Sequence, residues 1–367
     1  MDTVLIDAGQ FLPLGLRPGG VLARVVVDEA LIGRLMHYWA LSRASYCTIT
    51  FFQGTRCRYP MSSRLPVDLP SAHQRNVNNS YPATLLCIVP VHNRADTTKR
   101  FLDGLSRQRF ERLRVLVVDD GSTDGTSAML KEYRGLQLQV ITGSGKLWWG
   151  GAMRLGMEIA AKQMSARDAL LMLNDDVEIG DDFLERLWRR ANELGPRVVI
   201  GCQQQDLDAV LPSFFGYTVN YLSCNVQMLT DPPKDRELID VDALCGRGTL
   251  ISSEVITRIG HVDSERFPHF WGDIEYTARA KDMGFRTVCD PNIVVSTSFQ
   301  ASDRKRIGGN HWRRFISPFS SWNILHNYRF WSSRGPKPLA RTALFRFPLI
   351  KCSRALIKII HNPRLDS

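Results

Sequence analysis

The stretch LRVLVVDDGSTDGT, residues 113–126, decides the fold. It begins with a continuous apolar run that has the length of a β-strand and ends abruptly in Asp119 and Asp120. The turn signal GSTDGT follows and opens a helix-like segment at residues 127–133. Apolar strands without alternation are typical of a parallel sheet that is covered on both faces. The stretch therefore predicts a buried strand, a tight turn and a helix, with two acids at the carboxyl end of the strand.

The same succession of buried strand and helix recurs on both sides of this stretch. It predicts an α/β fold with a mostly parallel central sheet and helices on both faces. Ligands of such sheets gather at the carboxyl ends of the strands. We expect strands at 83–91, 136–143, 168–176 and 197–203, and helices at 96–108, 152–164 and 181–194.

A second group of oxygen-bearing side chains, Asn174, Asp175 and Asp176, ends the predicted strand 168–176. Such a group suits a hard divalent cation, or hydrogen bonds from a base and a ribose. Alternatively, the two aspartates only begin a turn.

A further acid, Asp273, lies outside these two groups. It follows a glycine and precedes a helix-like run in which Glu275 and Arg279 are spaced to form an ion pair. Asp273 is either a helix N-cap or a functional carboxylate beside the aromatic cluster of Phe267, Phe270 and Trp271.

The glycine-rich stretch VITGSGKLWWGGAMRLG, residues 140–156, resembles a phosphate-binding loop at first sight. It follows the third predicted strand, however, and the first strand carries no glycine fingerprint, so we do not expect a dinucleotide cradle. Its tryptophans, Trp148 and Trp149, belong either to the core or to the wall of a ligand site.

The net charge of +10 is concentrated at one end of the chain. Residues 303–367 contain 14 Lys/Arg and 2 Asp/Glu, so the remainder of the chain has a net charge of −2. Basic and apolar residues alternate over 341–360, with Pro348 interrupting any helix. This composition favours a helix at a membrane interface, while a helix docked on the main domain is the alternative. We expect no nucleic-acid binding, because no nucleic-acid module accompanies the charge.

The eight cysteines contain no C-x-x-C pair and no zinc-finger spacing, which indicates buried free thiols in a reducing compartment. No apolar run reaches the ~20 residues of a spanning helix, and the first residues do not resemble a secretory signal. We therefore expect a cytoplasmic protein, peripheral on the cytoplasmic face of the membrane. We divide the chain into an N-terminal extension and linker of unknown role (1–80), a main domain (81–302) and a basic amphipathic region (303–367).

Four motifs carry a family resemblance: LLCIVPVHNR, LVVDDGSTDGT, LLMLNDDV and FWGDIEYTARAKDMGF. In this order and spacing they resemble the family 2 glycosyltransferases of GT-A fold over residues 83–300. The stretch LWWGGAM is similar to the rhamnosyltransferase-like branch, which assembles bacterial surface polysaccharides. The resemblance implies that 81–302 is a GT-A catalytic domain.

The resemblance also assigns the nucleotide and metal sites. Asn174, Asp175 and Asp176 occupy the D-x-D position, with Asp176 as the ligand of Mg²⁺ or Mn²⁺ and Asn174 in place of the first aspartate. Relatives often carry a histidine after the segment DPNIVV, whereas His311 is the nearest downstream histidine here. The implied nucleotide-binding residues are Pro90, Val91 and Asn93 with Arg94 beside them, and Asp119, which binds the base or ribose, with Asp120 at the rim.

The sugar, the diphosphate and the acceptor are assigned in the same way. Asp273 falls at the position of the general base, although Gly272 replaces the acid that often precedes it. In CGRGTLIS, residues 245–252, Gly246 admits close approach to the donor and Arg247 contacts the diphosphate, or the glycines only form a bend. The remaining implied donor contacts are Arg154, Trp148, Trp149 and Trp271.

The residues and the resemblance predict an inverting glycosyltransferase. It moves a sugar from a nucleotide-diphospho-sugar to a hydroxyl of a glycan or lipid-linked acceptor in cell-surface polysaccharide synthesis. Such a displacement needs one carboxylate base and a cation on the departing diphosphate, whereas a retaining hydrolase needs two flanking carboxylates. A nucleotidyltransferase is one alternative, although PVHNRAD lacks the expected glycine-rich loop after the first strand. A catalytically inactive nucleotide-sugar-binding protein is the other, because Asn174 and Gly272 replace acids.

Overall fold

The computed structural model describes residues 81–108, 110–208, 212–221, 224–232, 236–298, 315–317, 320–321 and 323–334. The extension predicted at 1–80 and the amphipathic stretch at 341–360 lie outside these residues, as do His311 and three of the cysteines.

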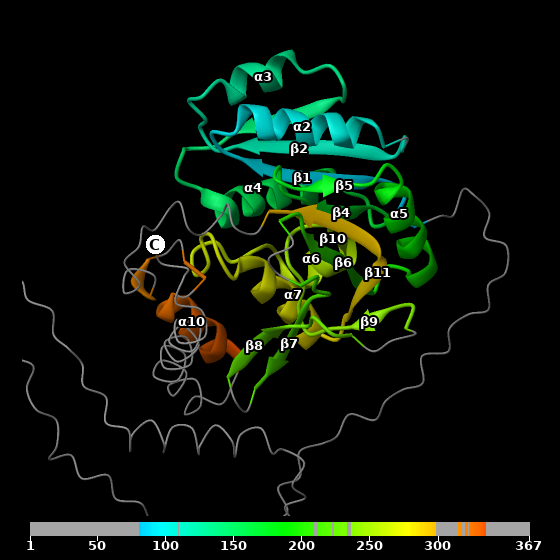
Figure 1. Ribbon diagram of the computed structural model, residues 1–367, viewed down its shortest axis with the longest axis vertical. Helices are drawn as coiled ribbons and strands as arrows, with labels where there is room; N and C mark the ends of the chain where they lie inside the picture. The colour runs from blue at the N-terminus through cyan, green and yellow to red at the C-terminus, as the bar shows by residue number, and fades with distance from the viewer. Residues whose placement is uncertain are drawn as a thin grey trace, which may run out of the picture. The chain divides into compact units, whose positions relative to one another are not determined.

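A large central sheet organises the described domain (Figure 1). Its strand order is β3-β2-β1-β4-β10-β6-β11-β5, with β9 paired to β11. The segment β3-β2-β1-β4, which carries the predicted acids, is parallel throughout, whereas β10 runs antiparallel between β4 and β6. The strands are β1 Leu85–Val91, β2 Leu113–Asp119, β3 Leu138–Thr142, β4 Ala169–Met172, β5 Glu178–Ile179, β6 Val198–Asp206, β9 Ile239–Asp240, β10 Thr249–Ser252 and β11 Arg286–Thr297.

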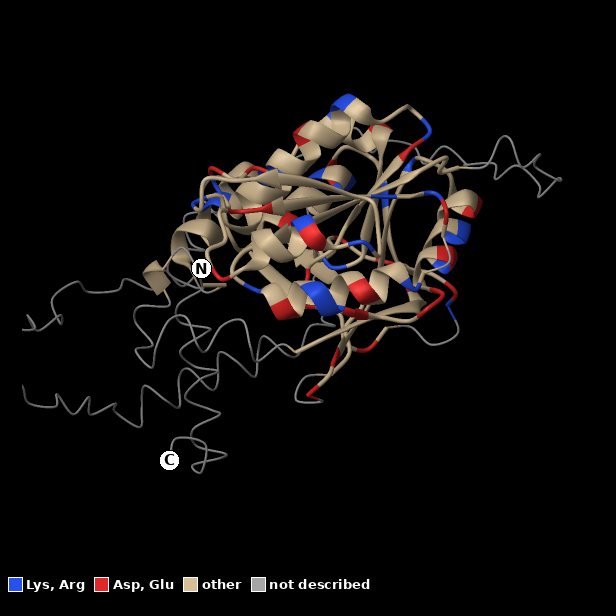
Figure 2. Cartoon of the chain, turned by 90° about the horizontal axis from the view of Figure 1, so that it is seen from above, with Lys and Arg blue, Asp and Glu red and all other residues tan. Residues whose placement is uncertain are grey.

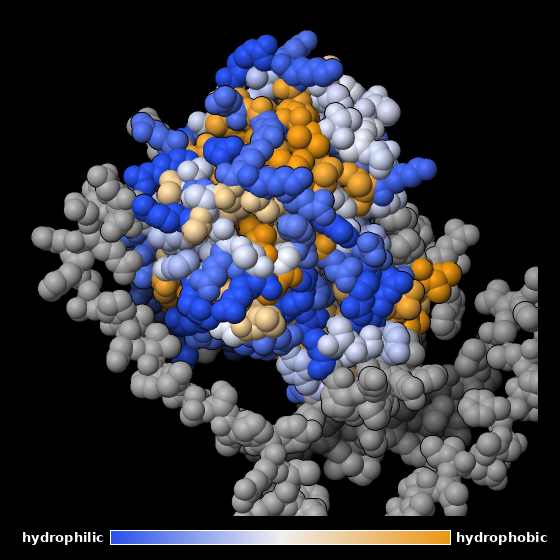
Figure 3. Space-filling view, turned by 180° about the vertical axis from the view of Figure 1, so that it is seen from behind, coloured by the Kyte–Doolittle hydropathy of each residue, from blue (hydrophilic) through white to orange (hydrophobic). Residues whose placement is uncertain are grey.

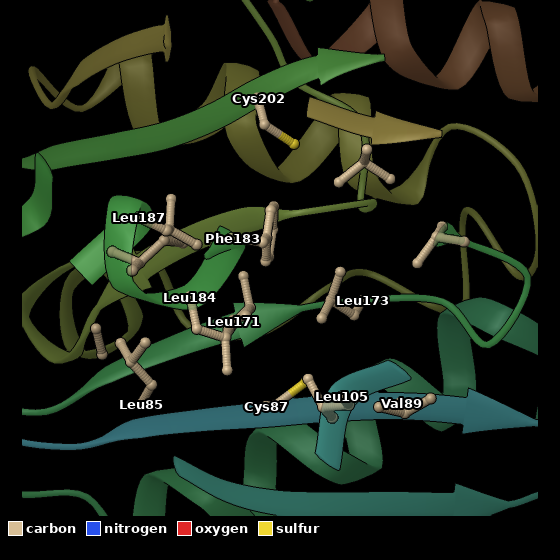
Figure 4. Close-up of a cluster of buried hydrophobic side chains, with 14 of the residues drawn as sticks. Leu85, Cys87, Val89, Leu105, Leu171, Leu173, Phe183, Leu184, Leu187 and Cys202 are labelled. Atoms are coloured by element: carbon tan, nitrogen blue, oxygen red, sulfur yellow. The ribbon is translucent and has the colours of Figure 1, made fainter. Parts of the chain in front are cut away.

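Helices cover both faces of this sheet, as the apolar strands predicted. On one face, Leu105 of α2 and Phe183 and Leu187 of α5 pack with Leu85 and Cys87 of β1 (Figure 4). On the other face, side chains of α4, α6 and α7 pack against the same strands. The helices are α2 Ala95–Ser106, α3 Thr126–Glu132, α4 Trp148–Gln163, α5 Phe183–Leu194, α6 Ser253–Ile259, α7 Gly272–Asp282 and α10 Ile324–Arg334.

The predicted elements are confirmed with two shifts that matter for the site. Helix α4 begins at Trp148, four residues before the predicted start, so the two tryptophans belong to its first turn. Strand β4 ends at Met172, and Asn174 to Asp176 follow it in a turn rather than inside the strand. The five described cysteines are free and buried, as expected.

A third apolar cluster joins elements that are far apart in the sequence. The hairpin of β7 (Tyr217–Asn220) and β8 (Asn225–Met228) contributes Val219 to it. Helix α10 contributes Phe330 and Trp331, which are fully buried against residues before and within α7. In Figure 1, α10 lies beside this hairpin and α7. The domain boundary at 302 stays a prediction, but this helix beyond it packs onto the domain.

The described surface is polar and mixed in charge. Figure 2 shows basic and acidic residues side by side on the helices, as in the Arg186–Asp182 and Arg189–Glu185 pairs of α5. From behind, apolar side chains gather in the upper part of the domain and are bordered by hydrophilic ones (Figure 3). None of the helices in the described ranges has the length and apolar character needed to cross a membrane.

Candidate active site

A cavity of about 750 Å³ opens at the carboxyl ends of β1 and β4, where the parallel strands predicted a ligand site. Its other walls come from the first turns of α4 and α7, the segment before β10, strand β8 and α10. Of the residues predicted for the site, three are absent from the lining: Asn93, Asp119 and Arg154. Those that line it are Pro90, Val91, Arg94, Asp120, Trp148, Trp149, Asn174, Asp175, Asp176, Gly246, Arg247, Trp271 and Asp273.

The three residues outside the lining have partners within the protein. The Asp119 carboxylate accepts hydrogen bonds from the Ser122 N–H (3.0 Å) and the Ser127 hydroxyl. Asn93 Oδ1 accepts the Thr123 N–H at 2.7 Å, which ties the end of β1 to the same turn. Arg154 pairs with Glu158 on the surface of α4. Nucleotide or diphosphate contacts for these three residues therefore stay predictions.

Asp120 holds the glycine-rich loop in place. Its carboxylate accepts the N–H groups of Gly145 (2.7 Å), Leu147 (2.8 Å) and Trp148 (3.0 Å). The N–H groups of Leu147 and Trp148, at the start of α4, are thus used by an internal carboxylate, which also compensates the positive end of the helix dipole. These N–H groups therefore serve the internal packing of the loop, and the expectation that it is no dinucleotide cradle stays a prediction.

The two tryptophans of the loop have different surroundings. Trp149 donates its indole N–H to Asn174 Oδ1 at 2.9 Å, and a Cβ at Gly246 would lie 2.5 Å from its ring. Trp149 therefore orients Asn174 and needs glycine at position 246. Trp148 adopts φ of 57°, which is uncommon for a bulky residue, and 40% of it is exposed. Its ring meets His269 edge-on at 6.2 Å, on the wall of the cavity.

Arg94 connects the two aspartates of the turn after β4. Its Nη1 donates to Asp175 Oδ1 at 3.1 Å and to Asp176 Oδ2 at 3.0 Å. Asp175 also accepts the Thr98 hydroxyl at 2.8 Å, and burial raises the pKa of this carboxyl to about 6. Both oxygens of Asp175 thus accept hydrogen bonds from residues at the start of α2. Asp176, in contrast, keeps one oxygen, Oδ1, that is buried without a hydrogen-bond partner in the described part of the chain.

This oxygen is what makes the turn fit a divalent cation. Mg²⁺ and Mn²⁺ prefer oxygen ligands and often keep waters and substrate phosphate oxygens in their shell. Asp176 Oδ1 and the amide oxygen of Asn174 offer such ligands, although the described residues contain no cluster of three His, Cys, Asp or Glu side chains. The site therefore fits a cation that has few protein ligands and completes its shell with waters or with phosphate oxygens of a ligand.

Asp273 lies in the first turn of α7 and faces the same cavity. Its carboxylate accepts the N–H of Gly246 at 2.8 Å and of Ile274 at 2.9 Å. The N-cap position belongs to Trp271, so the interpretation of Asp273 as the cap is wrong. Burial raises the pKa of Asp273, and the hydrogen bonds from these two N–H groups reduce the size of that rise. Arg247 is within electrostatic reach of both Asp273 and Asp176.

Residues 86–251 match the sequence model described as glycosyl transferase family 2. This region is a family 2 glycosyltransferase domain. The match confirms the predicted family and the GT-A type of α/β fold. It ends before Asp273, and the rhamnosyltransferase-like branch stays a prediction. No curated protein matches the chain in sequence.

Several solved glycosyltransferase structures are similar to this one at low identity. The mannosyltransferase PcManGT from Pyrobaculum calidifontis, with GDP-Man and Mn²⁺, has a TM-score of 0.46 and 18% identity over 76% of this chain and 81% of its own. TarS 1–349 of S. aureus with UDP-GlcNAc has a TM-score of 0.48 and 15% identity over 72% and 71%. GalNAc-T7 with UDP, GalNAc and Mn²⁺ has a TM-score of 0.48 and 13% identity over 60% of this chain. The chain spans 44% of the length of GalNAc-T7.

Some walls of the glycosyltransferase cavity were missed by sequence reasoning. Strand β8 lines it over its whole length, and Tyr217, His269 and Asn327 line it from other elements. No motif marks β8, Tyr217 or Asn327, and Asn327 lies in the predicted basic region 303–367. The aromatic cluster did signal part of this wall, since Phe270 and Trp271 line the cavity while Phe267 is fully buried behind them.

Proposed function

We propose that this glycosyltransferase transfers a sugar with inversion, in one displacement, with Asp273 as the general base. The observation that carries the proposal is the Asp273 carboxylate, held by two backbone N–H groups in the cavity that Asp176 and Arg247 also line. One base opposite a cationic diphosphate site is what a single displacement requires.

The proposed step balances as follows. The acceptor oxygen forms a bond to the anomeric carbon while the bond from that carbon to the diphosphate oxygen breaks. Asp273 takes the proton of the acceptor hydroxyl, and the nucleoside diphosphate leaves with the electron pair. The raised pKa makes Asp273 a stronger base than an ordinary aspartate, but it acts only when deprotonated. We therefore expect kcat/KM for transfer to rise with pH and to level off above the pKa of Asp273.

Asp176 and Asn174 are the proposed protein ligands of a divalent cation. When bound, the cation would neutralise charge on the departing diphosphate. Arg94 supports this role because its ion pair fixes the orientation of Asp176. Arg247, which lies within electrostatic reach of both acids, adds a permanent positive charge on the proposed diphosphate side.

The biological setting is proposed from the resemblance and the charge distribution. The similarity of the motifs to enzymes of bacterial surface polysaccharides supports an acceptor from that synthesis. The net charge of +12 on residues 303–367 supports contact with the cytoplasmic face of an anionic membrane, where a lipid-linked acceptor would lie. The family 2 match favours this function over a nucleotidyltransferase.

A donor panel tests the function. The full chain is incubated with Mn²⁺ and each of several UDP-, GDP- and dTDP-sugars, and the products are identified by mass spectrometry. We expect hydrolysis or transfer with at least one donor. Neither turnover nor a thermal shift with any donor would overturn the proposal, and a thermal shift without turnover would favour the inactive binding protein.

The role of Asp273 is tested with the identified donor. Asp273→Asn should lower transfer by about 10²–10⁴-fold, because the amide cannot accept the proton, while the donor Kd stays within about twofold. Asp181→Asn is the matched control, since this aspartate is 80% exposed at the start of α5. If the Asp273→Asn variant still transfers sugar at the wild-type rate, the proposal is contradicted and Asp273 has only a structural role.

A further inference from the structure

Asn327 of α10 has a buried side chain with an unused hydrogen-bond acceptor. The residue is 2% exposed and lines the cavity. Its Oδ1 is shielded from solvent and accepts no hydrogen bond from any described residue. Buried polar atoms in native proteins almost always have a partner, and an unsatisfied one lowers stability. Because Asn327 lines the cavity, its oxygen gains the missing partner when the side-chain amide turns toward a ligand that brings a donor.

Helix α10 is fixed firmly enough to present this oxygen in a defined place. Arg334 donates to the main-chain oxygen of Glu275 (2.8 Å) and to its carboxylate (3.0 Å), and both side chains are nearly buried. At the other end, Trp271 donates its indole N–H to the Ser321 carbonyl at 3.1 Å. Because Glu275 and Trp271 flank Asp273 in sequence, α10 is anchored next to the proposed base.

The wall around Asn327 differs in charge from the rest of the cavity. The lining residues of β8 and α10 include Asn225, Gln227 and Asn327 but no Lys, Arg, Asp or Glu. The charged lining residues lie instead at the sheet edge, before β10 and at the start of α7. Phe270 and Trp271 add flat aromatic surface beside the amides. Amide groups together with aromatic faces suit an uncharged ligand that is rich in hydroxyl groups.

We propose that Asn327 is a specificity-determining residue of an acceptor subsite for an uncharged saccharide. A hydroxyl of the acceptor donates its hydrogen bond to Asn327 Oδ1, between β8 and Trp271. The donor diphosphate occupies the opposite, charged side, near Asp176 and Arg247. This inference rests on the proposed function, because it names the acceptor class of the same site.

The test replaces Asn327 with leucine, which has a similar size and no polar atom. The acceptor probes are p-nitrophenyl glycosides, which are uncharged, and the donor is the one that the panel identifies. We expect the acceptor KM to rise about tenfold, the value of one hydrogen bond to a ligand. Donor KM and donor hydrolysis without acceptor should stay unchanged. The melting temperature should stay equal or rise, since the unsatisfied oxygen is gone.

Two further variants sharpen the test. Leu325→Ala changes an exposed residue of the same helix and should leave every parameter unchanged. Asn327→Ala should give the same rise in acceptor KM as leucine. An unchanged acceptor KM in both Asn327 variants would overturn the proposal, and so would unfolding of both, which would assign a structural role.

The wild-type protein separates this inference from the proposed function. If donor hydrolysis occurs but no glycoside raises turnover above it, the uncharged acceptor is refuted while the donor function stands. If no donor is turned over or bound, the proposed function itself fails.

Discussion

The two sides of the cavity are built in different ways. On the proposed donor side, Asp119 ends β2 and Asp120 follows it, and N–H and hydroxyl groups further along the chain donate to both carboxylates. On the acceptor side, Asn327 comes from a helix that reaches the cavity only through tertiary packing, and its oxygen has no described partner. The proposed donor side thus bonds the oxygens of Asp119 and Asp120 within the protein and leaves Asp176 Oδ1 for a cation, whereas the proposed acceptor side leaves Asn327 Oδ1 for a ligand hydroxyl. The following predictions test this contrast.

The largest effect is expected at the junction of the two sides. Gly150 of α4 packs against the segment before α7, where an added Cβ would lie 2.5 Å and 2.8 Å from the carbonyl oxygens of Phe267 and Pro268. Because these main-chain carbonyl groups cannot easily move away from an added methyl group, Gly150→Ala should lower the free energy of unfolding by about 3 kcal/mol or more. Both donor and acceptor KM should rise. Urea unfolding and steady-state kinetics measure the two effects.

A matched control comes from a second helix glycine. Gly104 of α2 meets only Arg107 Nη2, at 3.5 Å, so Gly104→Ala should stabilise the protein by about 0.5–1 kcal/mol. Equal effects of the two substitutions would contradict the proposed junction.

A smaller effect should be confined to the donor side. Asp120→Asn keeps the size of the side chain but replaces one accepting oxygen with a donor, which then faces backbone N–H groups of the loop. We expect a loss of roughly 2 kcal/mol in unfolding free energy and a higher donor KM, with the acceptor KM unchanged. Asp96→Asn, at an exposed position of α2, should change stability by less than about 0.5 kcal/mol. An acceptor KM that rises together with the donor KM would show that the two sides are not independent.

The pH dependence of stability should show an effect that comes from a single carboxyl group. The pKa of Asp175 is about 6 in the folded protein, so the folded state binds this proton more tightly than the unfolded chain does. The free energy of unfolding should therefore fall as pH rises, by about 2 kcal/mol between pH 4.5 and pH 7. Asp175→Asn should remove this part of the slope. Denaturant titrations across this pH range measure it, and an unchanged slope in the variant would contradict the role of Asp175.

The donor side could be predicted from sequence because its signals are local. A buried strand that ends in an acid, as at Asp119, or that acids follow, as at Asp176, places these acids at one edge of a parallel sheet. Sequence did not reveal how each acid is used, since Asp120 and Asp175 are bonded within the protein by groups from other segments. That distinction depends on loop geometry, such as the early start of α4 at Trp148.

The acceptor side could not be predicted for a related reason. Strand β8 carries no motif, and its wall forms only because β7 pairs with it and α10 packs beside it. For the basic region 303–367, the sequence left open contact with a membrane or docking on the main domain, and within it Phe330 and Trp331 of α10 are buried while Arg334 pairs with Glu275. Composition alone does not distinguish a helix at a membrane from a helix docked on the domain, because each of them buries an apolar face.

Helix α10 lies beyond residues 86–251, the part of the chain that defines the family. The proposed acceptor contact is therefore encoded apart from the motifs that build the donor edge. Drift in the C-terminal part of the gene would alter the choice of acceptor while the nucleotide-sugar chemistry is inherited intact. Exchange of this segment between related enzymes would be a route to new glycan linkages from one ancestral donor site.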